Sequence, residues 1–313
     1  MLLCMTFRLL ACTLLSVSAL VSCGPDADAP SLAGNTQAAA IEGEAFYQKA
    51  KQADDDGSVN KAIKLYDETA TRFPFAPSAP QARFRQAELL QQKGEILKSF
   101  DAYDKFLSRF QGSSLYSTAL NRQIAMAQSA ADGEVKSSLM GIKTRLSVDK
   151  TVEMLEKVRN NAPKSAAAAK AQFTVGQLYE ANKQYKKAIA AYRLLVKDQP
   201  SSSQAPEALF RVGVILTDEA DRGNQNQGNL DLAREAFNDY LIQYPGHSRN
   251  AEARRLEAGL GGRDLQRSYD VAEFYRKTGK LDSAKVYYRD IMARSKSGEF
   301  HDKAQARLKE LGE

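Results

Sequence analysis

Residues 175–200 read VGQLYEANKQYKKAIAAYRLLVKDQP, in which two stretches with helical periodicity are separated by a short polar turn. Gly176 stands twelve positions before Ala188, Tyr192 follows Ala188 by four positions, and Pro200 closes the segment. Small residues let two helices approach closely, and a large aromatic ring fills the space beside them. Proline ends the second helix because its predecessor is pushed out of helical geometry. The stretch therefore predicts a helical hairpin.

The same arrangement recurs along most of the chain, with a period of roughly 34 residues that resembles the tetratricopeptide repeat. The small residue of the first helix and the small residue of the second are twelve positions apart in four repeats. Such a spacing, kept four times, disfavours an irregular helical bundle with accidental periodicity. The matching positions are Ala50, Ala62, Tyr66 and Pro74 in the first repeat, Ala87, Ser99 and Tyr103 in the second, Gly176, Tyr179, Ala188, Tyr192 and Pro200 in the fourth, Gly213, Ala233, Phe237 and Pro245 in the fifth, and Ala272, Tyr275, Ala284 and Tyr288 in the sixth.

The predicted fold class is all-α: a tetratricopeptide-repeat α-solenoid of about six helical hairpins over residues 41–313. Each hairpin buries its apolar face only against its neighbours, so the hairpins stack into a superhelix. We divide it into N-terminal repeats, residues 41–165, and C-terminal repeats, residues 166–313. No segment alternates with period two over a useful length, so strands are expected to be absent or trivial.

Two repeats depart from the pattern. In the third, Ile124 replaces the small residue, and a long segment intervenes before the second helix. In the fifth, the small residues of the two helices are twenty positions apart instead of twelve, because DRGNQNQG, residues 221–228, stands between the helices. We interpret it as an inserted loop that can be removed at little cost, since the entropy of closing a loop changes slowly with its length.

The N-terminus reads as a targeting segment. Arg8 precedes thirteen uncharged residues, Leu9–Val21, which are too few to cross a bilayer but typical of a signal peptide. The run ends in LVSC, residues 20–23, which resembles the bacterial lipoprotein box; the alternatives are an ordinary export signal or a short buried helix. The resemblance implies a signal peptide at residues 1–22 and acyl chains on Cys23, with no other cofactor. Gly24 in place of aspartate then implies the outer membrane, facing the periplasm.

Residues 23–40 are interpreted as a lipidated flexible tether. The segment from Gly24 to Ala40, GPDADAPSLAGNTQAAA, is rich in Ala, Pro, Gly and Asp and has little to bury. A coil of this length reaches roughly 20–25 Å, which would hold the solenoid close to the membrane.

The sequence contains no arrangement typical of an enzyme or a metal site. It lacks a Gly-rich phosphate loop, a His–Cys cluster and a nucleophile elbow. The two histidines, His247 and His301, are far apart, and all three cysteines lie in the first 23 residues. The formal net charge of +6 is spread among mixed charges, which favours an acidic partner or anionic lipid headgroups over nucleic acid. We therefore predict a non-catalytic binding protein without a metal.

A ladder of aromatic residues is the candidate binding feature. In five of six repeats, an aromatic residue stands three positions before the small residue of the first helix; the third repeat has Asn121 there. In tetratricopeptide stacks the first helices line a groove that takes peptides, so these rings either contact a ligand or pack between the helices. They are Tyr47, Phe84, Phe173, Phe210 and Tyr269.

Between the first two repeats the chain reads FPFAPSAPQA, residues 73–82, with three prolines in seven positions. The prolines fix the exit from one hairpin and the entry to the next, and Pro80 is expected near the start of a helix. Phe75 has two possible roles. It either plugs the gap between the two repeats, which we favour, or projects to meet a partner.

The lipoprotein box, the tether and the repeats together resemble the outer-membrane-protein assembly lipoproteins, the BamD or ComL family. TRFPFAPSAPQARF, residues 71–84, is similar to the proline-rich connection after the first repeat of that family. YDVAEFYRKTGKLDSAKVYYRDIM, residues 269–292, is similar to its penultimate helical pair, whereas ARSKSGEF, residues 293–300, departs from it. The resemblance implies a scaffold whose C-terminal repeats dock a β-barrel insertase with periplasmic modules. Its N-terminal repeats would receive unfolded outer-membrane proteins.

Two other functions are compatible with such repeats. One is a periplasmic coordinator of cell-envelope constriction, of the Tol–Pal-associated type; that family usually has an N-terminal coiled coil, and no sustained heptad precedes Ile41 here. The other is an accessory subunit of an envelope enzyme such as a peptidoglycan hydrolase.

Overall fold

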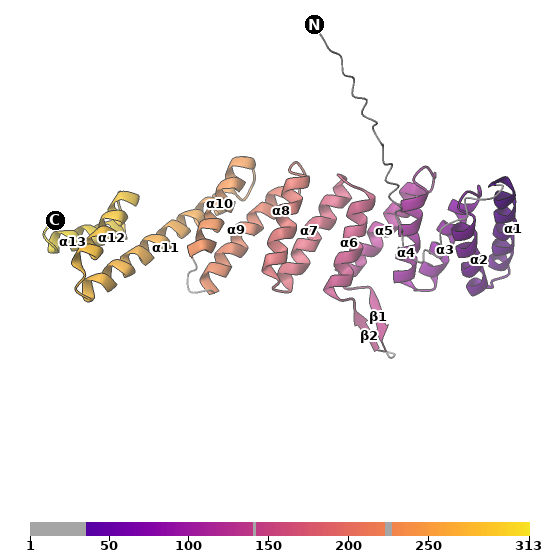
Figure 1. Ribbon diagram of the computed structural model, residues 1–313, viewed down its shortest axis with the longest axis horizontal. Helices are drawn as coiled ribbons and strands as arrows, with labels where there is room; N and C mark the ends of the chain where they lie inside the picture. The colour runs from indigo at the N-terminus through magenta and orange to yellow at the C-terminus, as the bar shows by residue number, and fades with distance from the viewer. Residues whose placement is uncertain (1–35, 140–141, 223–226) are drawn as a thin grey trace, which may run out of the picture.

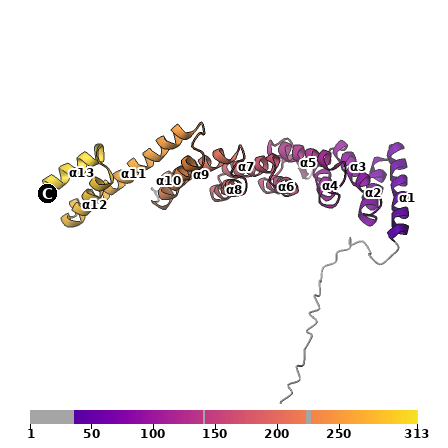
Figure 2. The same ribbon diagram turned by 90° about the horizontal axis from the view of Figure 1, so that it is seen from above.

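The computed structural model describes residues 36–139, 142–222 and 227–313. Within them, thirteen helices follow one another as antiparallel hairpins that stand side by side along one long axis (Figures 1 and 2). The prediction of an all-α solenoid of about six hairpins is therefore confirmed. The leader, Cys23 and most of the predicted tether lie outside the described residues, and α1 begins five residues before the expected start at Ile41.

Successive helices pair into six hairpins, and α13 packs on the last of them. Their bounds are α1 Thr36–Asp55 and α2 Val59–Arg72, α3 Ala79–Gln92 and α4 Ile96–Arg109, α5 Tyr116–Ala131 and α6 Val148–Asn161, α7 Ala166–Ala181 and α8 Tyr185–Asp198, α9 Ala205–Arg222 and α10 Gln227–Gln243, α11 Asn250–Lys277 and α12 Leu281–Arg294, and then α13 Glu299–Glu310. We call the odd-numbered members of these pairs first helices and the even-numbered members second helices.

The repeat positions have the packing that their residue types predicted. Ala62, Ala188 and Ala284 are completely buried, as is the ring of Tyr192. A β-carbon added to Gly176 would overlap that ring, and one added to Gly213 would lie 2.6 Å from the ring of Phe237. The small residues are therefore required where the aromatic of the second helix lies against the backbone of the first.

In five of the hairpins, the turn that follows the first helix contains one residue with positive φ. Glycine supplies it in four of them, whereas Lys183 adopts a φ of 59° in the turn between α7 and α8. A side chain is disfavoured in this left-handed conformation, which glycine adopts without steric cost. The four glycines are Gly57, Gly94, Gly133 and Gly279.

The third hairpin carries the only strands of the described chain. β1 Lys136–Leu139 and β2 Ile142–Arg145 pair antiparallel, with Lys136 opposite Arg145, in the segment between α5 and α6. This β-hairpin projects from one edge of the solenoid (Figure 1). The sequence predicted no strand of useful length, and four residues are too few for a period-two pattern to stand out.

The fifth hairpin corrects the interpretation of residues 221–228 as a loop. Asp221 and Arg222 belong to α9, and Gln227 and Gly228 belong to α10, so only residues 223–226 fall between the described helices. Arg263 of α11 also donates a hydrogen bond to Asp221 over 2.6 Å. Much of the extra length is therefore helical, and removing all eight residues would cut into both helices.

Helix α11 joins two separate cores. Its N-terminal half contributes Ala253 and Leu260 to the core of the fourth and fifth hairpins, whereas Ala272 belongs to the core shared with α12 and α13. Between these halves the sequence is AGLGG, residues 258–262. A β-carbon added to Gly259, Gly261 or Gly262 would meet nothing within 4 Å, so packing does not explain these glycines.

Candidate functional site

The five ladder aromatics all pack inside their own hairpins. Each ring lies 5.5–5.8 Å, between centroids, from an aromatic ring of the second helix. Phe84 and Phe210 are buried, whereas the other three are half-buried. Asn121, at the same position of the third repeat, is exposed. The structure thus places the ladder in five separate hairpins. A contact of these rings with a ligand stays a prediction. The pairs are Tyr47–Tyr66, Phe84–Tyr103, Phe173–Tyr192, Phe210–Phe237 and Tyr269–Tyr288.

The residue that fills the gap after the first hairpin is Phe73, and the interpretation of Phe75 as the plug is wrong. Phe75 is 66% exposed, whereas Phe73 is 7% exposed and its ring centroid lies 5.2 Å from that of Phe46. A β-carbon added to Gly43 of α1 would lie 2.6 Å from Cβ of Phe73, so α1 and the connection that follows α2 are in close contact there. The connection then leads into α3, with Pro80 in its first turn as predicted.

A second recurring feature links one hairpin to the next. A tyrosine of a second helix donates a hydrogen bond to a carboxylate of the preceding first helix, and an arginine of the following helix binds the same carboxylate. We call this set of three residues a clamp. The clamps are Tyr66–Asp54–Arg85, Tyr192–Glu180–Arg211 and Tyr288–Glu273–Arg307.

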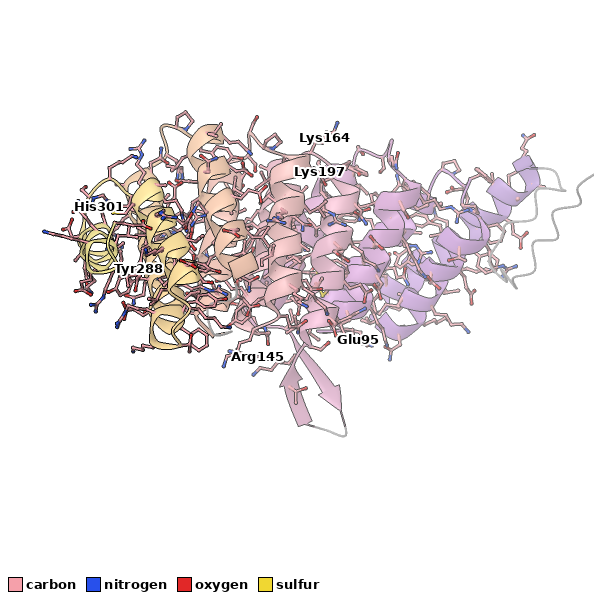
Figure 3. The ribbon with its side chains drawn as sticks, turned by 60° about the vertical axis from the view of Figure 1, so that its left-hand side comes forward. Glu95, Arg145, Lys164, Lys197, Tyr288 and His301 are labelled. Atoms are coloured by element: carbon pink, nitrogen blue, oxygen red, sulfur yellow. The ribbon has the colours of Figure 1, made fainter. Side chains whose placement is uncertain are left out.

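The clamps consist of charge-assisted hydrogen bonds, because the acceptor in each is a carboxylate. Arg85 Nε lies 2.6 Å from Asp54 Oδ2, and its second nitrogen Nη2 lies 3.1 Å from Oδ1. In the last clamp, the hydroxyl of Tyr288 lies 2.6 Å from Glu273 Oε1, and Arg307 Nε lies 2.9 Å from the same oxygen. Figure 3 labels Tyr288 among the C-terminal helices. Each clamp therefore ties three consecutive helices through one carboxylate.

The electrostatics of the clamps suit a structural role. Burial, strengthened by the neighbouring carboxylate, raises the pKa of Tyr66, Tyr192 and Tyr288. Their hydroxyls therefore stay protonated and act as donors. Hydrogen bonding from Arg276, with further contributions from Tyr288 and Arg307, lowers the pKa of Glu273 to about 2. None of these groups is poised to exchange a proton near neutral pH.

The second hairpin contains an incomplete clamp. Arg122 donates to Gln91 over 3.2 Å and lies 3.6 Å from Glu88. The hydroxyl of Tyr103, however, is buried and has no hydrogen-bond partner among the described residues. Burial raises its pKa to about 12. In the fifth hairpin Phe237 takes the tyrosine position, so no hydroxyl is present.

The clamps were not predicted from the sequence, although the sequence contains a regular interval that marks them. In all three clamps, the arginine stands nineteen positions after the tyrosine, and Arg122 follows Tyr103 by the same interval. Such an interval crosses from one repeat to the next, and a comparison of repeat with repeat does not reveal it.

One clamp and one ladder residue come together in a groove between the first helices α7 and α9. The groove has a volume of about 480 Å³. Tyr192 of α8 forms part of its lining, Phe173 lies on the α7 side, and Glu180 and Arg211 join the two helices across it. The exposed Ala181 adds a small apolar surface, and the exposed Asp218 adds negative charge. Such a groove can accept an apolar side chain beside a polar or basic one.

Within the described ranges, no three His, Cys, Asp or Glu side chains form a group that could hold a metal ion. In the same residues, no helix combines the length and apolarity needed to span a bilayer.

Family models for the tetratricopeptide repeat match two parts of the chain, residues 47–114 and residues 170–202. The first match covers the C-terminal part of α1 together with α2, α3 and α4, and the second covers most of α7–α8. The chain therefore carries tetratricopeptide repeats, the class of repeat that resemblance suggested. No curated protein matches the sequence significantly.

Several solved structures, two of them of tetratricopeptide-repeat proteins, are similar at low identity. YrrB, described as having an unusual peptide-binding site, is 18% identical over 79% of this chain and 97% of its own, with a TM-score of 0.31. The apo form of RapI is 15% identical over 82% and 100%, with a TM-score of 0.31. A repeat protein of Thermus thermophilus, TTC0263, is 14% identical over 70% and 98%, with a TM-score of 0.30. TM-scores this low transfer nothing from these proteins to the present chain.

Proposed function

We propose that the protein is a non-catalytic scaffold of the β-barrel assembly machinery, anchored in the outer membrane through acyl chains on Cys23 and facing the periplasm. Its repeats are of a class that serves as protein-interaction scaffolds. The finer assignment rests on the lipoprotein box at residues 20–23 and on the resemblance of residues 71–84 and 269–292 to the assembly lipoproteins. In this proposal the C-terminal repeats dock the insertase and the N-terminal repeats receive unfolded substrates.

The observation that carries the binding function is the groove between α7 and α9. It offers the half-buried Phe173 and the exposed Ala181 to an apolar side chain, and its rim carries Asp218. A strand of an outer-membrane barrel alternates apolar and polar residues, so an extended segment can present one side chain of each kind in succession. We therefore propose that this groove takes part in holding extended segments of the partner or substrate.

The proposed partner is tested by recovery of complexes from detergent-solubilised membranes. We expect the chain to recover a large β-barrel protein with periplasmic modules. Recovery of the constriction machinery of the Tol–Pal system would favour the alternative function and contradict the present one.

The groove is tested with two exposed alanines. Ala181 lines the groove, whereas Ala190 lies on α8 outside the lining. We expect Ala181→Arg to weaken binding of barrel-strand peptides at least about tenfold with an unchanged melting temperature, since it fills the groove without burying a charge. Ala190→Arg is the matched control. Equal effects of the two variants on binding would remove the groove from the proposal.

The anchor is tested with Cys23→Ser, which abolishes acylation. We expect the variant to fold and to leave the membrane fraction, because more than one acyl chain is needed for durable anchoring and no described helix can span a bilayer. Fractionation in high salt measures this. A variant that still sediments with outer membranes would show that another part of the protein anchors it.

A further inference from the structure

The positive charge of the chain is concentrated in one segment. Residues 157–197 contain nine Lys or Arg residues and a single acid, Glu180, a net charge of +8 against +6 for the whole chain. The remainder of the chain is therefore slightly negative. The segment runs from the end of α6 through α7 and α8, and so includes nearly the whole fourth hairpin.

Seven of these nine side chains are exposed and form no ion pair with any described residue. Glu180 does not neutralise them, because it is engaged by Tyr192 and Arg211 in its clamp. Lys187 alone has an aromatic partner, the ring of Tyr179 at 5.1 Å. We call the seven residues the basic band: Lys164, Lys170, Lys183, Lys186, Lys187, Arg193 and Lys197.

Helix α8 carries four of the seven band residues, and three of these lie on one face. Lys186, Arg193 and Lys197 recur at helical spacing on the side opposite its buried residues, which include Ala188 and Leu195. Lys164, from the turn between α6 and α7, lies at the same edge of the solenoid as Lys197 (Figure 3). The next second helix, α10, instead exposes Glu235 and Asp239. The basic band is thus a local surface, with an acidic surface on the following hairpin.

The composition of the band indicates what it binds. Protein interfaces centre on aromatic and apolar anchors. The exposed large hydrophobic residues of the described chain all lie elsewhere, and none falls between residues 157 and 197. Seven cations on two helices and the turns before them, without an apolar anchor, match a binding surface that has a high density of negative charge and no fixed shape. Anionic lipid headgroups form such a surface, and each nearby Lys or Arg contributes to attraction by them.

We propose that the basic band docks the fourth hairpin onto anionic lipid headgroups, so that the solenoid lies against the membrane instead of swinging freely from its tether. The inference rests on the proposed membrane location, since a bilayer must be within reach. It does not depend on the identity of the protein partner.

The test measures binding of residues 24–313 to vesicles. Every core cluster of the described chain lies within residues 46–311, so this part retains the fold and contains neither leader nor acyl chain. We expect it to sediment with vesicles of equal parts phosphatidylethanolamine and phosphatidylglycerol, but not with phosphatidylcholine alone. Binding should fall steeply as NaCl is raised, because salt screens exposed charges.

The decisive variant replaces four band residues on α8, Lys186, Lys187, Arg193 and Lys197, with glutamine. We expect binding to weaken by more than about 30-fold, since each basic residue near an anionic surface contributes about fivefold. The matched control makes the same change at four exposed cations on the second helices α2 and α4, Lys61, Lys64, Lys105 and Arg109, and should stay within about threefold.

A third variant, with Lys186, Lys187 and Lys197 replaced by arginine, keeps the charge and should bind like the unmodified chain. Melting temperatures establish that all three variants fold. Equal losses in the band and control variants would reduce the effect to net charge and overturn the proposal, as would failure of the unmodified chain to bind anionic vesicles. Either result leaves the proposed partner and the acyl anchor untouched.

Discussion

At the scale of single residues, the connection after the first hairpin contains two phenylalanines in opposite environments. Phe73 packs against Phe46 and Gly43, whereas Phe75 is 66% exposed. The sequence could not separate them, because both flank Pro74 and neither lies in a periodic segment. Their burial depends on where α1 lies, which local sequence does not specify.

We expect Phe73→Ala to lower the free energy of unfolding by about 3–5 kcal/mol, the cost of truncating a buried phenylalanine. Phe75→Ala should change it by less than about 0.5 kcal/mol, as is usual for an exposed residue. Urea unfolding of the two variants measures both values. A loss at Phe75 as large as that at Phe73 would show that the exposed ring is covered in the folded protein.

Lys183 is a second residue whose conformation has a measurable cost. Its φ of 59° is the left-handed value that glycine supplies at Gly57, Gly94, Gly133 and Gly279. We expect Lys183→Gly to raise the free energy of unfolding by about 1 kcal/mol, since the strain on the side chain is relieved. Gly57→Lys is the converse control and should lower it by a similar amount. A thermal melt in which Lys183→Gly is destabilising would contradict this account.

At the scale of elements, the three clamps connect the first hairpin to the second, the fourth hairpin to the fifth, and the sixth hairpin to α13. In the clamp of the fourth hairpin, the Glu180 side chain is 16% exposed and accepts from Tyr192 and Arg211. Removing it leaves a buried hydroxyl and a partly buried guanidinium without their acceptor, which costs more than the net value of the bonds.

We therefore expect Glu180→Ala to lower the free energy of unfolding by about 2–3 kcal/mol. Glu156→Ala, at an exposed acid of α6 that forms no ion pair with the described residues, should cost less than about 0.5 kcal/mol. A double-mutant cycle with Arg211→Ala measures the coupling between the two clamp residues. A coupling energy indistinguishable from zero would mean that the clamp does not join the hairpins.

The last clamp makes the C-terminal helices sensitive to acid. The pKa of Glu273 is lowered from 4.5 to about 2, chiefly by its hydrogen bond from Arg276. A lowered pKa means that the ionised form stabilises the fold. This contribution is complete above about pH 4.5 and is lost as the pH falls towards 2.

We expect Glu273→Gln to lower the melting temperature above pH 4.5, and the difference from the unmodified chain to shrink between pH 4.5 and pH 2. Melting curves of both proteins across this range provide the measurement. A difference that stays constant over the range would exclude the carboxylate charge as its source.

At the scale of the whole molecule, the solenoid was predictable because its main determinants are local. Gly176, Ala188 and Tyr192 meet inside one hairpin, so their spacing directly reflects a contact. The clamps were not predicted, because each unites two residues of one hairpin with a residue of the helix that follows it. The interval between the tyrosine and the arginine does not by itself predict a clamp either. Arg122 follows Tyr103 by the same nineteen positions, yet the hydroxyl of Tyr103 has no partner among the described residues.

The candidate site was less predictable than the fold. The ladder correctly marked positions on the first helices, but of its members only Phe173 lines the groove between α7 and α9. The shape of a groove depends on the distance between successive hairpins, which no residue pattern within one repeat encodes. The continuity of helix α11 could not be predicted either, since the three glycines in AGLGG disfavour a helix at that point.

That helix has a geometric consequence for the whole molecule. It is 28 residues long, and at about 1.5 Å per residue it measures about 42 Å. The stretch beyond Gly262 extends about 22 Å to Lys277 and carries α12 and α13 with it. This stretch can pivot about the turn that contains Gly259, Gly261 and Gly262. No neighbouring side chain packs against these glycines, and helices bend easily at such positions. A bend of about 10° at the glycines displaces the C-terminal end of α11 by about 4 Å, while the repeats before the glycines keep their positions.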